Sequence, residues 1–427
     1  MRRVGHFIVV ASLALPILAA WLPGISTPVE ARDPSGPQGK SASLPQGKSV
    51  REGREIFRHD TFGDEQLWTD VLRMHEVIPK AVSPRVALSV GLKVDAQALP
   101  REIQKALRAC TVDLDDPATT VALLQVDAVV GLKGTVDDAG RLTSVGVTCA
   151  LCHSTVDDSF APGIGRRLDG WANSDLNVGA IAALSPFFDK DEDTKKALNS
   201  WGPGMYDPRH HVFDGANLIA LHPTSTPASI PVVIPSIYGL QGVGFETYTA
   251  DGPISYWNSY VGVSQMGGHG NFLDPRIGLN IVQTPDMVTP KLPALLAYQL
   301  SLRAPEPPRG AFNQAAANRG QRLFNGEAGC ASCHQGPHFT DVLSGPNRAV
   351  PVLHDPSEVG TDAAYAQRTA TGQYRTTPLR GLLFHPPYFH DGSAPTLTAV
   401  VDHYDAVGNL RLTAQQKRDL VEYLKTL

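Results

Sequence analysis

Four of the five cysteines in this chain stand in two copies of one short pattern. Residues 149–153 read Cys-Ala-Leu-Cys-His, and residues 330–334 read Cys-Ala-Ser-Cys-His. Positions i, i+3 and i+4 share one face of a helix, so two thiols and an imidazole can point to the same side. Cys-x-x-Cys-His is the attachment signature of c-type haem, in which the histidine binds iron. The pattern predicts two covalently bound haems, one on Cys149, Cys152 and His153 and one on Cys330, Cys333 and His334.

A zinc site and a redox dithiol are the alternative uses of such cysteines. Zinc would require both cysteine pairs to converge on one ion. A thioredoxin-like dithiol is expected within a βαβ unit, and no such pattern surrounds either motif. Both alternatives are therefore weaker than haem attachment. The fifth cysteine, Cys110, is predicted to be a small buried apolar residue.

The first 31 residues have the features of a cleaved secretory signal. Two arginines precede an apolar run over residues 7–22, and small residues flank a cleavage position near residue 31. The run is short for a bilayer span and contains a proline, which argues against a membrane anchor. We therefore expect a periplasmic or secreted protein without a membrane span after cleavage. The formal net charge of −5 offers no basic surface for nucleic acid.

The rest of the chain is expected to be mainly α, with two cytochrome c-like haem domains, long ordered loops and an N-terminal helical extension. Helical segments are expected at residues 65–77, 100–109, 292–302 and 413–427, and residues 201–270 are rich in loop-forming residues. The expected units are a flexible leader over 32–50, the helical extension over 51–140, the first haem domain with its loop-rich insert over 141–305, and the second haem domain over 310–427.

Two short segments look like the first helix of a cytochrome c. Residues 319–324 (Arg-Gly-Gln-Arg-Leu-Phe) stand just before the second haem motif. Residues 53–57 (Gly-Arg-Glu-Ile-Phe) are similar, but no cysteine pair follows them directly. We therefore expect the 53–57 segment to form a structural helix that packs on the first haem domain.

The C-terminal third carries a family resemblance. Residues 377–381 (Thr-Pro-Leu-Arg-Gly), 387–393 (Pro-Tyr-Phe-His-Asp-Gly-Ser) and the Thr396-Leu397 pair resemble the C-terminal half of bacterial dihaem cytochrome c peroxidases, a superfamily that includes MauG-type oxidases and dihaem rubber oxygenases. The resemblance is specific over 320–427, weak over 140–270 and absent over 51–140. It implies that a six-coordinate C-terminal haem passes electrons to or from an N-terminal haem that meets peroxide or oxygen.

The resemblance also implies ligands for the second haem. In the peroxidases a methionine ligand follows the Thr-Leu pair, and that position falls on Tyr404, as in MauG-type proteins. His403 is adjacent and points about 100° away on a helix, so only one of the two can face the iron. The alternative for Tyr404 is an aromatic core residue. Arg380 is the expected partner of a haem propionate or of Asp391, because its planar fork suits carboxylates.

His390 is expected to be a structural histidine hydrogen-bonded near a propionate.

Around the first haem the sequence departs from the family. The turn at residues 234–239 lacks the expected asparagine, so a bridging calcium is a weak expectation. Ala250 stands where the peroxidases have a tryptophan, for which Trp257 is a substitute or a core residue. Glu246 is the candidate acid–base carboxylate, and an exposed surface position is its alternative. Met266 and His269 are candidate sixth ligands that would close the site, and His269 is also the second candidate for the acid–base group.

Two classes of function follow. The favoured one is a peroxidase or oxidase that uses hydrogen peroxide or oxygen and takes electrons from a small redox protein, a cytochrome or a cupredoxin. The alternatives are a non-catalytic dihaem electron carrier and a dihaem oxygenase that acts on an apolar substrate. The state of the first iron separates these classes, because an open sixth position permits substrate chemistry.

Overall fold

The computed structural model describes residues 46–208, 229–343 and 351–427. The expected signal peptide over residues 1–31 and residues 32–45 of the expected leader lie outside these ranges. Within them, no helix combines the length and apolar character that a bilayer span requires.

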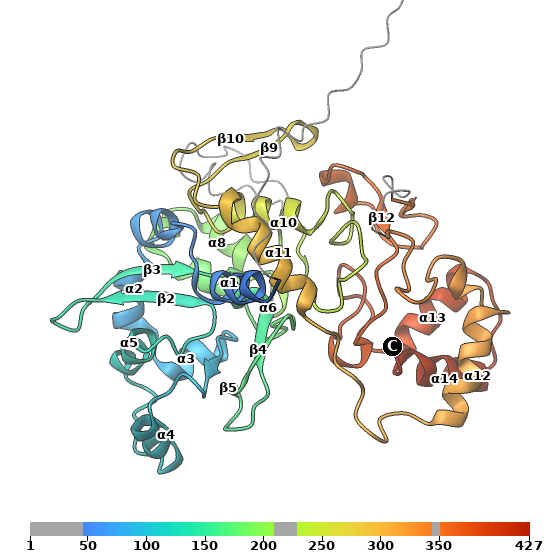
Figure 1. Cartoon of the computed structure of the whole chain (residues 1–427), viewed down its shortest axis with the longest axis horizontal. Helices are drawn as coiled ribbons and strands as arrows, with labels where there is room; N and C mark the ends of the chain where they lie inside the picture. The colour runs from blue at the N-terminus through green and yellow to red at the C-terminus, as the bar shows by residue number, and fades with distance from the viewer. Residues whose placement is uncertain (1–45, 209–228, 344–350) are drawn as a thin grey trace, which may run out of the picture. The chain divides into compact units, whose positions relative to one another are not determined.

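The described chain is mainly α-helical, as the sequence predicts, and its strands are short (Figure 1). The α-helices are α1 (Gln46–His59), α2 (Met74–Ala81), α3 (Pro84–Ser89), α4 (Arg101–Arg108), α5 (Pro117–Gln125), α6 (Ala150–His153), α7 (Val178–Ala183), α8 (Glu192–Asn199), α10 (Ile254–Tyr260), α11 (Leu292–Ser301), α12 (Gln314–Asn325), α13 (Leu397–Val407) and α14 (Ala414–Leu424). Two π-helical turns, η1 (Gln66–Val71) and η4 (Val261–Gln265), and several 3₁₀ turns complete the helical part.

Within the described residues the strands form two-stranded sheets. One pair is parallel, β1 (Val94–Asp95) with β5 (Ile164–Gly165). The antiparallel pairs are β2 (Leu132–Val136) with β3 (Leu142–Val147), β4 (Ser154–Val156) with β6 (Arg167–Asp169), β7 (Met205–Tyr206) with β8 (Val232–Val233), β9 (Phe272–Asp274) with β10 (Leu279–Ile281), and β11 (Leu353–His354) with β12 (Tyr374–Arg375). The β2–β3 hairpin leads directly into the first haem motif.

Helix α1 packs against α11 through a glycine. A Cβ atom at Gly53 would lie 1.9 Å from the carbonyl oxygen of Ala294, so a larger side chain would hold the two helices apart. Phe57, one turn further along α1, has no exposed surface and contacts the ring of Tyr298 with 5.5 Å between centroids. The 53–57 segment therefore packs against α11, the helix that ends the first haem region.

Helices α12 and α14 repeat this arrangement around the second haem motif. A Cβ atom at Gly320 would lie 2.0 Å from the carbonyl oxygen of Asp419. Arg319 adds a bidentate ion pair to this contact. Its Nε and Nη2 atoms each lie 2.7 Å from a carboxylate oxygen of Asp419. Helix α14 begins with a capping box between Thr413 and Gln416, which fixes where the helix starts.

The buried apolar residues divide into one large cluster and two smaller ones. The large cluster takes residues from Ile56 to Tyr298 and includes most of the helices between α1 and α11. The second lies between Phe324 and Leu424, around α12, α13 and α14. The range 51–140, expected as an extension, thus contributes to the same core as the first haem motif, and α1 begins at Gln46 inside the range expected for the leader.

Residues 229–252 run between these two cores and contact both. The backbone amide of Gly239 donates to Leu302, whereas that of Gly244 donates to Val342. Val233 donates to the carbonyl oxygen of His390 over 2.7 Å. Because this segment pairs with residues on both sides, it joins the two cores, and its Pro235 carbonyl oxygen lies beside His153 of the first haem motif.

Two segments depart from the sequence expectations for secondary structure. Residues 254–265, expected to be loop, form α10 and η4, and burial of Trp257 and Tyr260 stabilises a helix whose local periodicity is weak. Residues 65–77, expected to form one helix, divide into η1 and α2 because Arg73 between them has a left-handed backbone with φ of 55°.

The expectation for Cys110 is wrong. Its thiol is exposed, directly after α4, and no residue of that helix is buried. Because α4 lies at the periphery, the apolar residues around Cys110 do not enclose it.

Candidate functional site

The second haem motif presents its histidine in a defined protonation state. Cys330–Ser332 form a 3₁₀ turn, and the chain then turns to bring His334 toward Phe339. The Nδ1 atom of His334 lies 2.9 Å from the carbonyl oxygen of Phe339. A carbonyl oxygen only accepts hydrogen bonds, so Nδ1 carries the proton and Nε2 keeps its lone pair for a metal. Burial also lowers the pKa of His334, which favours the neutral ligand form.

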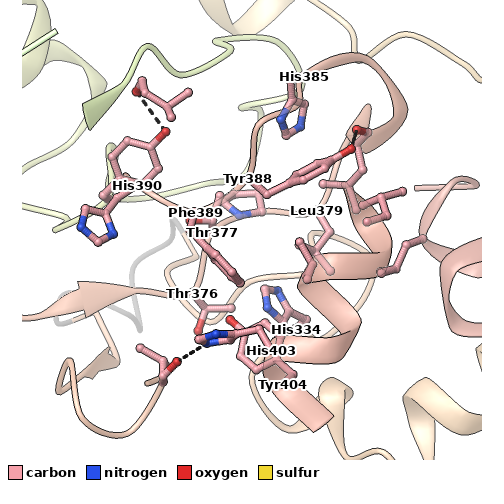
Figure 2. Close-up of a pocket in the computed structure, with 18 of the residues that line it drawn as sticks. His334, Thr376, Thr377, Leu379, His385, Tyr388, Phe389, His390, His403 and Tyr404 are labelled. Carbon is pink, nitrogen blue, oxygen red and sulfur yellow. Dashed lines mark hydrogen bonds between the residues drawn. The ribbon is translucent and has the colours of Figure 1, made fainter. Parts of the chain in front are cut away.

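Tyr404 lies in the same part of the cavity as His334, and His403 does not compete with it (Figure 2). Burial raises the pKa of Tyr404 to about 12, and the nearby thiols of Cys330 and Cys333 add to this effect. The Nε2 atom of His403 instead lies 2.9 Å from the carbonyl oxygen of Val359. Helix α13 therefore turns the phenol of Tyr404 toward the attachment cysteines, while His403 is held by the backbone.

A cavity of about 460 Å³ contains these groups. Its apolar wall at the second motif is formed by Phe324, Leu379, Leu382, Tyr388, Phe389, Leu397, Val400, Val401, Leu410, Leu412, Leu420 and Leu424. Two thiols, an imidazole with a free Nε2 and a facing phenol within an apolar wall are the groups that a c-type haem requires. The residues around the second motif thus fit the predicted cofactor.

The first haem motif has the same histidine arrangement. Helix α6 carries His153, whose Nδ1 atom lies 3.0 Å from the carbonyl oxygen of Pro235. Burial lowers the pKa of His153 to about 4, so its Nε2 atom is available as a ligand at neutral pH. The backbone amides of Gly170 and Asn173 donate to the carbonyls of His153 and Cys152 and hold the motif in place. The turn at residues 234–239, identified by sequence, supplies the orienting carbonyl.

The cavity that contains His334 extends to this turn. Pro235 and Ser236 line it, together with neighbouring residues of the first haem region, among them Ala172, Ser174, Gly204 and Met205. A single cavity therefore borders the turn that holds His153 and the second haem motif.

Glu246 and Trp257 are brought together, and Glu246 is buried. Its side chain is 9% exposed and its Oε2 atom lies 3.1 Å from Nη1 of Arg375, so the surface alternative is wrong. The indole nitrogen of Trp257 donates to the Glu246 carbonyl oxygen over 3.0 Å. Burial raises the pKa of Glu246, and Arg375 opposes this shift. The carboxyl group is thus buried in an ion pair with Arg375.

His269 and Met266 are absent from the described lining of the cavity, as are His153, Glu246 and Trp257. The Nδ1 atom of His269 lies 2.7 Å from the carbonyl oxygen of Pro285. Met266 is 6% exposed within the large apolar cluster, and its carbonyl oxygen accepts from the indole of Trp68.

Arg380 and His390 both line the cavity, with partners that the sequence did not identify. Arg380 donates to the carbonyl oxygen of Gly239 and to Nδ1 of His338, rather than to Asp391. The Nε2 atom of His390 lies 3.0 Å from the hydroxyl of Tyr374. Both residues therefore sit at the boundary between the 229–252 segment and the second haem region.

Sequence reasoning missed Arg375 and Tyr374. Both lie on β12, directly before the Thr-Thr-Pro-Leu-Arg-Gly motif, and both line the cavity. The Nε atom of Arg375 is buried and has no hydrogen-bond partner in the described structure. Their position next to that motif was the available signal, but nothing local distinguishes a buried arginine from an exposed one.

A bridging calcium finds no further support at the 234–239 turn. Within the described residues, two groups of side chains have the spacing of a metal site, namely Cys333, Asp341 and His354, and Asp362, His390 and Asp391. Neither group includes a residue of the turn.

The comparisons with known proteins agree with the motifs. The chain is 34% identical to the methylamine utilization protein MauG of Methylorubrum extorquens over 159 residues, which cover 31% of this chain and 42% of that protein. It is 33% identical to the cytochrome-c peroxidase IdrP2 of a Pseudomonas species over 143 residues, 26% of this chain and 39% of that protein. These matches support a relation to the superfamily of dihaem cytochrome c peroxidases and MauG-type proteins. The relatives are dihaem c-type cytochromes, which supports two c-type haems with iron in this chain.

The superfamily match covers part of each protein. The chain is also 31% identical to the cytochrome c551 peroxidase of Nitrosomonas europaea over 129 residues, 28% of this chain and 36% of that protein. It spans about two fifths of the length of these curated relatives. A solved structure of a MauG-like protein associated with microbial copper homeostasis aligns with a TM-score of 0.34 and 19% identity, over 52% of this chain and 86% of that one. No protein-family model matches the chain.

Proposed function

We propose that this protein is an exported dihaem peroxidase, which reduces hydrogen peroxide to two waters with two protons and two electrons from a small redox protein. Peroxidases among the curated relatives support the reaction class. Electrons enter at the C-terminal haem, and peroxide reacts at the N-terminal haem. Export rests on the signal-like residues 1–31.

The observation that carries this proposal is the difference between the two histidine sites. His334 shares its cavity with the phenol of Tyr404, which supports two protein ligands for the second iron. The two candidate sixth ligands of the first iron have contacts of their own: Nδ1 of His269 lies 2.7 Å from the carbonyl oxygen of Pro285, and Met266 is buried in the large apolar cluster. This contrast supports one closed haem and one open haem.

Haem iron supplies the centre at which peroxide binds and is reduced, and the protein must supply protons there. A positioned acid or base contributes about 10²–10⁴-fold to such a reaction. Glu246 is buried and its pKa is raised by that burial, so it is suited to hold and return a proton. Arg375 forms an ion pair with Glu246, and its buried Nε–H has no hydrogen-bond partner among the described residues. Trp257 holds the backbone of Glu246 in place.

The test measures ligand binding and peroxide reduction on the purified protein with both haems attached. We expect carbon monoxide to bind one of the two ferrous haems and hydrogen peroxide to oxidise the reduced protein rapidly. Glu246→Gln should slow the peroxide reaction at least about 10-fold while two haems per chain remain attached. Glu192→Gln, an exposed change on α8, is the matched control and should leave the rate unchanged.

If neither ferrous haem binds carbon monoxide and peroxide does not oxidise the protein, the peroxidase proposal is wrong. The protein is then an electron carrier with two six-coordinate haems.

A further inference from the structure

Two buried polar groups of the cavity have no hydrogen-bond partner among the described residues. They are the Nε–H of Arg375 and the hydroxyl of Thr247, and both residues line the cavity that contains the second haem motif. Buried donors in folded proteins are almost always paired, because an unmade hydrogen bond inside the protein is costly. Two unpaired donors in one cavity therefore indicate that the cavity receives an acceptor.

The guanidinium of Arg375 offers a complete edge to such an acceptor. Its side chain is 6% exposed, and Nη1 donates to the carbonyl oxygen of Phe245 and to Oε2 of Glu246. Its Nε and Nη2 atoms donate to no described residue. The Nε–Nη2 edge of an arginine matches the two oxygens of a carboxylate, which accept two parallel hydrogen bonds. This edge therefore suits a carboxylate.

Thr247 lies beside this guanidinium. Arg375 contacts the residues on both sides of it, since Nη1 lies 3.1 Å from Oε2 of Glu246 and the Arg375 backbone amide donates to the Tyr248 carbonyl oxygen over 2.9 Å. The backbone of Thr247 is left-handed, with φ of 59°, which is uncommon for a β-branched residue and persists only where surrounding contacts impose it. The hydroxyl and the guanidinium thus border the same part of the cavity.

The other arginine in the described lining of this cavity is already bonded to the protein. Arg380 donates through Nη1 to the carbonyl oxygen of Gly239 and through Nη2 to Nδ1 of His338. A carboxylate that is carried into a buried cavity requires a cation, because an unpaired buried charge is strongly unfavourable. Arg375 is the arginine of this lining whose Nε–Nη2 edge is available to meet that requirement.

Haem is a source of carboxylates in this cavity. A c-type haem has two propionates, on the side of the ring opposite the vinyl groups that the cysteines bind. Arg375 pairs with Leu353 of β11, and the adjacent His354 has a ring nitrogen within 4.8 Å of the Cys333 thiol. The side chain of Arg375 reaches Glu246 on the 229–252 segment. Arg375 therefore lies near the second haem motif, at the border between the cavity and that segment.

We propose that Arg375 and Thr247 form a carboxylate site that holds a propionate of the second haem. Arg375 binds the two oxygens through Nε and Nη2, and Thr247 donates its hydroxyl to one of them. The site concerns how the protein binds its cofactor, so it does not depend on the peroxidase reaction.

Glu246 allows one guanidinium to serve two carboxyl groups. Burial raises the pKa of Glu246, and Arg375 opposes this shift. A propionate on the other edge of Arg375 adds a negative charge nearby, which favours the protonated form of Glu246. A protonated Glu246 leaves the positive charge of Arg375 to the propionate. The ion pair and the propionate site therefore do not exclude each other.

The experiment follows the propionates in the full protein with both haems attached. Cells that express the protein are supplied with δ-aminolevulinate that carries ¹³C in its carboxyl group, which places the label in the haem propionates. Redox-difference infrared spectroscopy in an electrochemical cell then distinguishes these carboxylates from protein carboxylates by the isotope shift. Stepping the potential through each haem in turn assigns a labelled band to the first or to the second haem.

We expect a labelled band of the second haem to shift in Thr247→Val and in Arg375→Lys. Thr247→Val keeps the shape of the side chain and removes the hydroxyl, whereas Arg375→Lys keeps the charge and loses the planar fork. The reduction potential of the second haem should fall in Thr247→Val, because a hydrogen bond that offsets the propionate charge is lost.

Thr249→Val is the matched control. The hydroxyl of Thr249 is also buried without a partner in the same segment, but Thr249 is absent from the described lining of the cavity. This variant should leave the labelled bands and both potentials unchanged. Haem content and thermal unfolding show that each variant has folded, and Thr247→Val tests the site by itself if Arg375→Lys does not fold.

Three results would overturn the proposal. An unchanged labelled band in a folded Thr247→Val or Arg375→Lys variant would reject the two-residue site. An equal shift in Thr249→Val would show that the bands respond to any loss of a hydroxyl in this segment. A shift confined to the first haem would reject the assignment to the second haem.

Discussion

Glu246 and Arg375 form an ion pair inside the protein, with 3.1 Å between Oε2 and Nη1 and side chains that are 9% and 6% exposed. The two residues stand 129 positions apart in the chain. Arg375 also donates to the carbonyl oxygen of Phe245 and its backbone amide donates to Tyr248. The pair therefore joins the 229–252 segment to β12 by charge as well as by backbone pairing.

Removal of one partner of this pair should be costly. Arg375→Gln leaves the carboxylate of Glu246 buried without its cation, and we expect a loss of about 3 kcal/mol in the free energy of unfolding. The double variant Glu246→Gln/Arg375→Gln should be more stable than the sum of the single changes predicts. Guanidinium unfolding of the haem-loaded protein measures both effects. Arg73→Gln, which breaks an exposed pair with Glu76, is the control and should have little effect. If the losses in the free energy of unfolding of the two single variants add up to that of the double variant, the two residues are not coupled.

Tyr404 should control the second haem and His403 should not. Tyr404→Phe removes the phenol that shares the cavity with His334, so we expect the absorption spectrum of one haem to change and its reduction potential to rise. His403→Gln should leave both unchanged, because His403 is bonded to the Val359 carbonyl. Spectroelectrochemical titration measures both quantities. Tyr388→Phe, whose hydroxyl donates to the Leu382 carbonyl in the same cavity, is the control. A change in His403→Gln alone would assign the ligand to His403.

Gly53 should tolerate no side chain. Gly53→Ala places a Cβ atom 1.9 Å from the Ala294 carbonyl oxygen and must push α1 away from α11. Overpacking of this kind costs about 1–3 kcal/mol, which thermal unfolding of the haem-loaded protein would detect. Gly47→Ala changes the same helix where no atom lies within 4 Å of the added Cβ, so it should be neutral. Equal stability of the two variants would show that α1 and α11 can move apart at little cost in free energy, which would contradict this prediction.

Asp64 should make stability depend on pH. Burial raises the pKa of its carboxyl group well above the ordinary value, with Glu65 and Asp60 adding to the shift. Because the pKa is higher in the folded state, the folded protein favours the protonated carboxyl group. As the pH rises through the pKa of the folded state, Asp64 loses this proton and the protein becomes less stable. Asp64→Asn keeps an oxygen acceptor for the Val147 amide and removes the charge. At neutral pH we expect the free energy of unfolding of this variant to exceed that of the wild type by at least about 1 kcal/mol, since one pKa unit corresponds to about 1.4 kcal/mol. At pH 4 the two proteins should differ little.

Chemical denaturation across this pH range measures the difference. Asp70→Asn, an exposed change on the same segment, controls for the loss of a charge. A gain that is the same at pH 4 and pH 7 would contradict a raised pKa at Asp64.

Several features were predictable from local patterns. The haem attachment residues follow from a five-residue signature, and the helices near residues 292–302 and 413–427 follow from apolar periodicity. The family resemblance, laid along the helix after the Thr396-Leu397 pair, implied that Tyr404 faces the haem, and its burial near Cys330 and Cys333 is consistent with this. These signals are local, because covalent spacing and helical geometry depend on residues a few positions apart.

Other features depended on contacts between distant parts of the chain. The sequence alone predicted two haem motifs and a largely helical protein, and it left open what lies beside each iron. Only the tertiary structure brings Gly53 against Ala294, buries Glu246 against Arg375 and turns His403 toward Val359. Whether a carboxylate is exposed or buried, and which residue partners a histidine, is determined by the approach of segments 44 to about 240 positions away. Such contacts produce no periodic pattern in a single sequence, because each segment can adopt its local conformation whether or not the other segment contacts it.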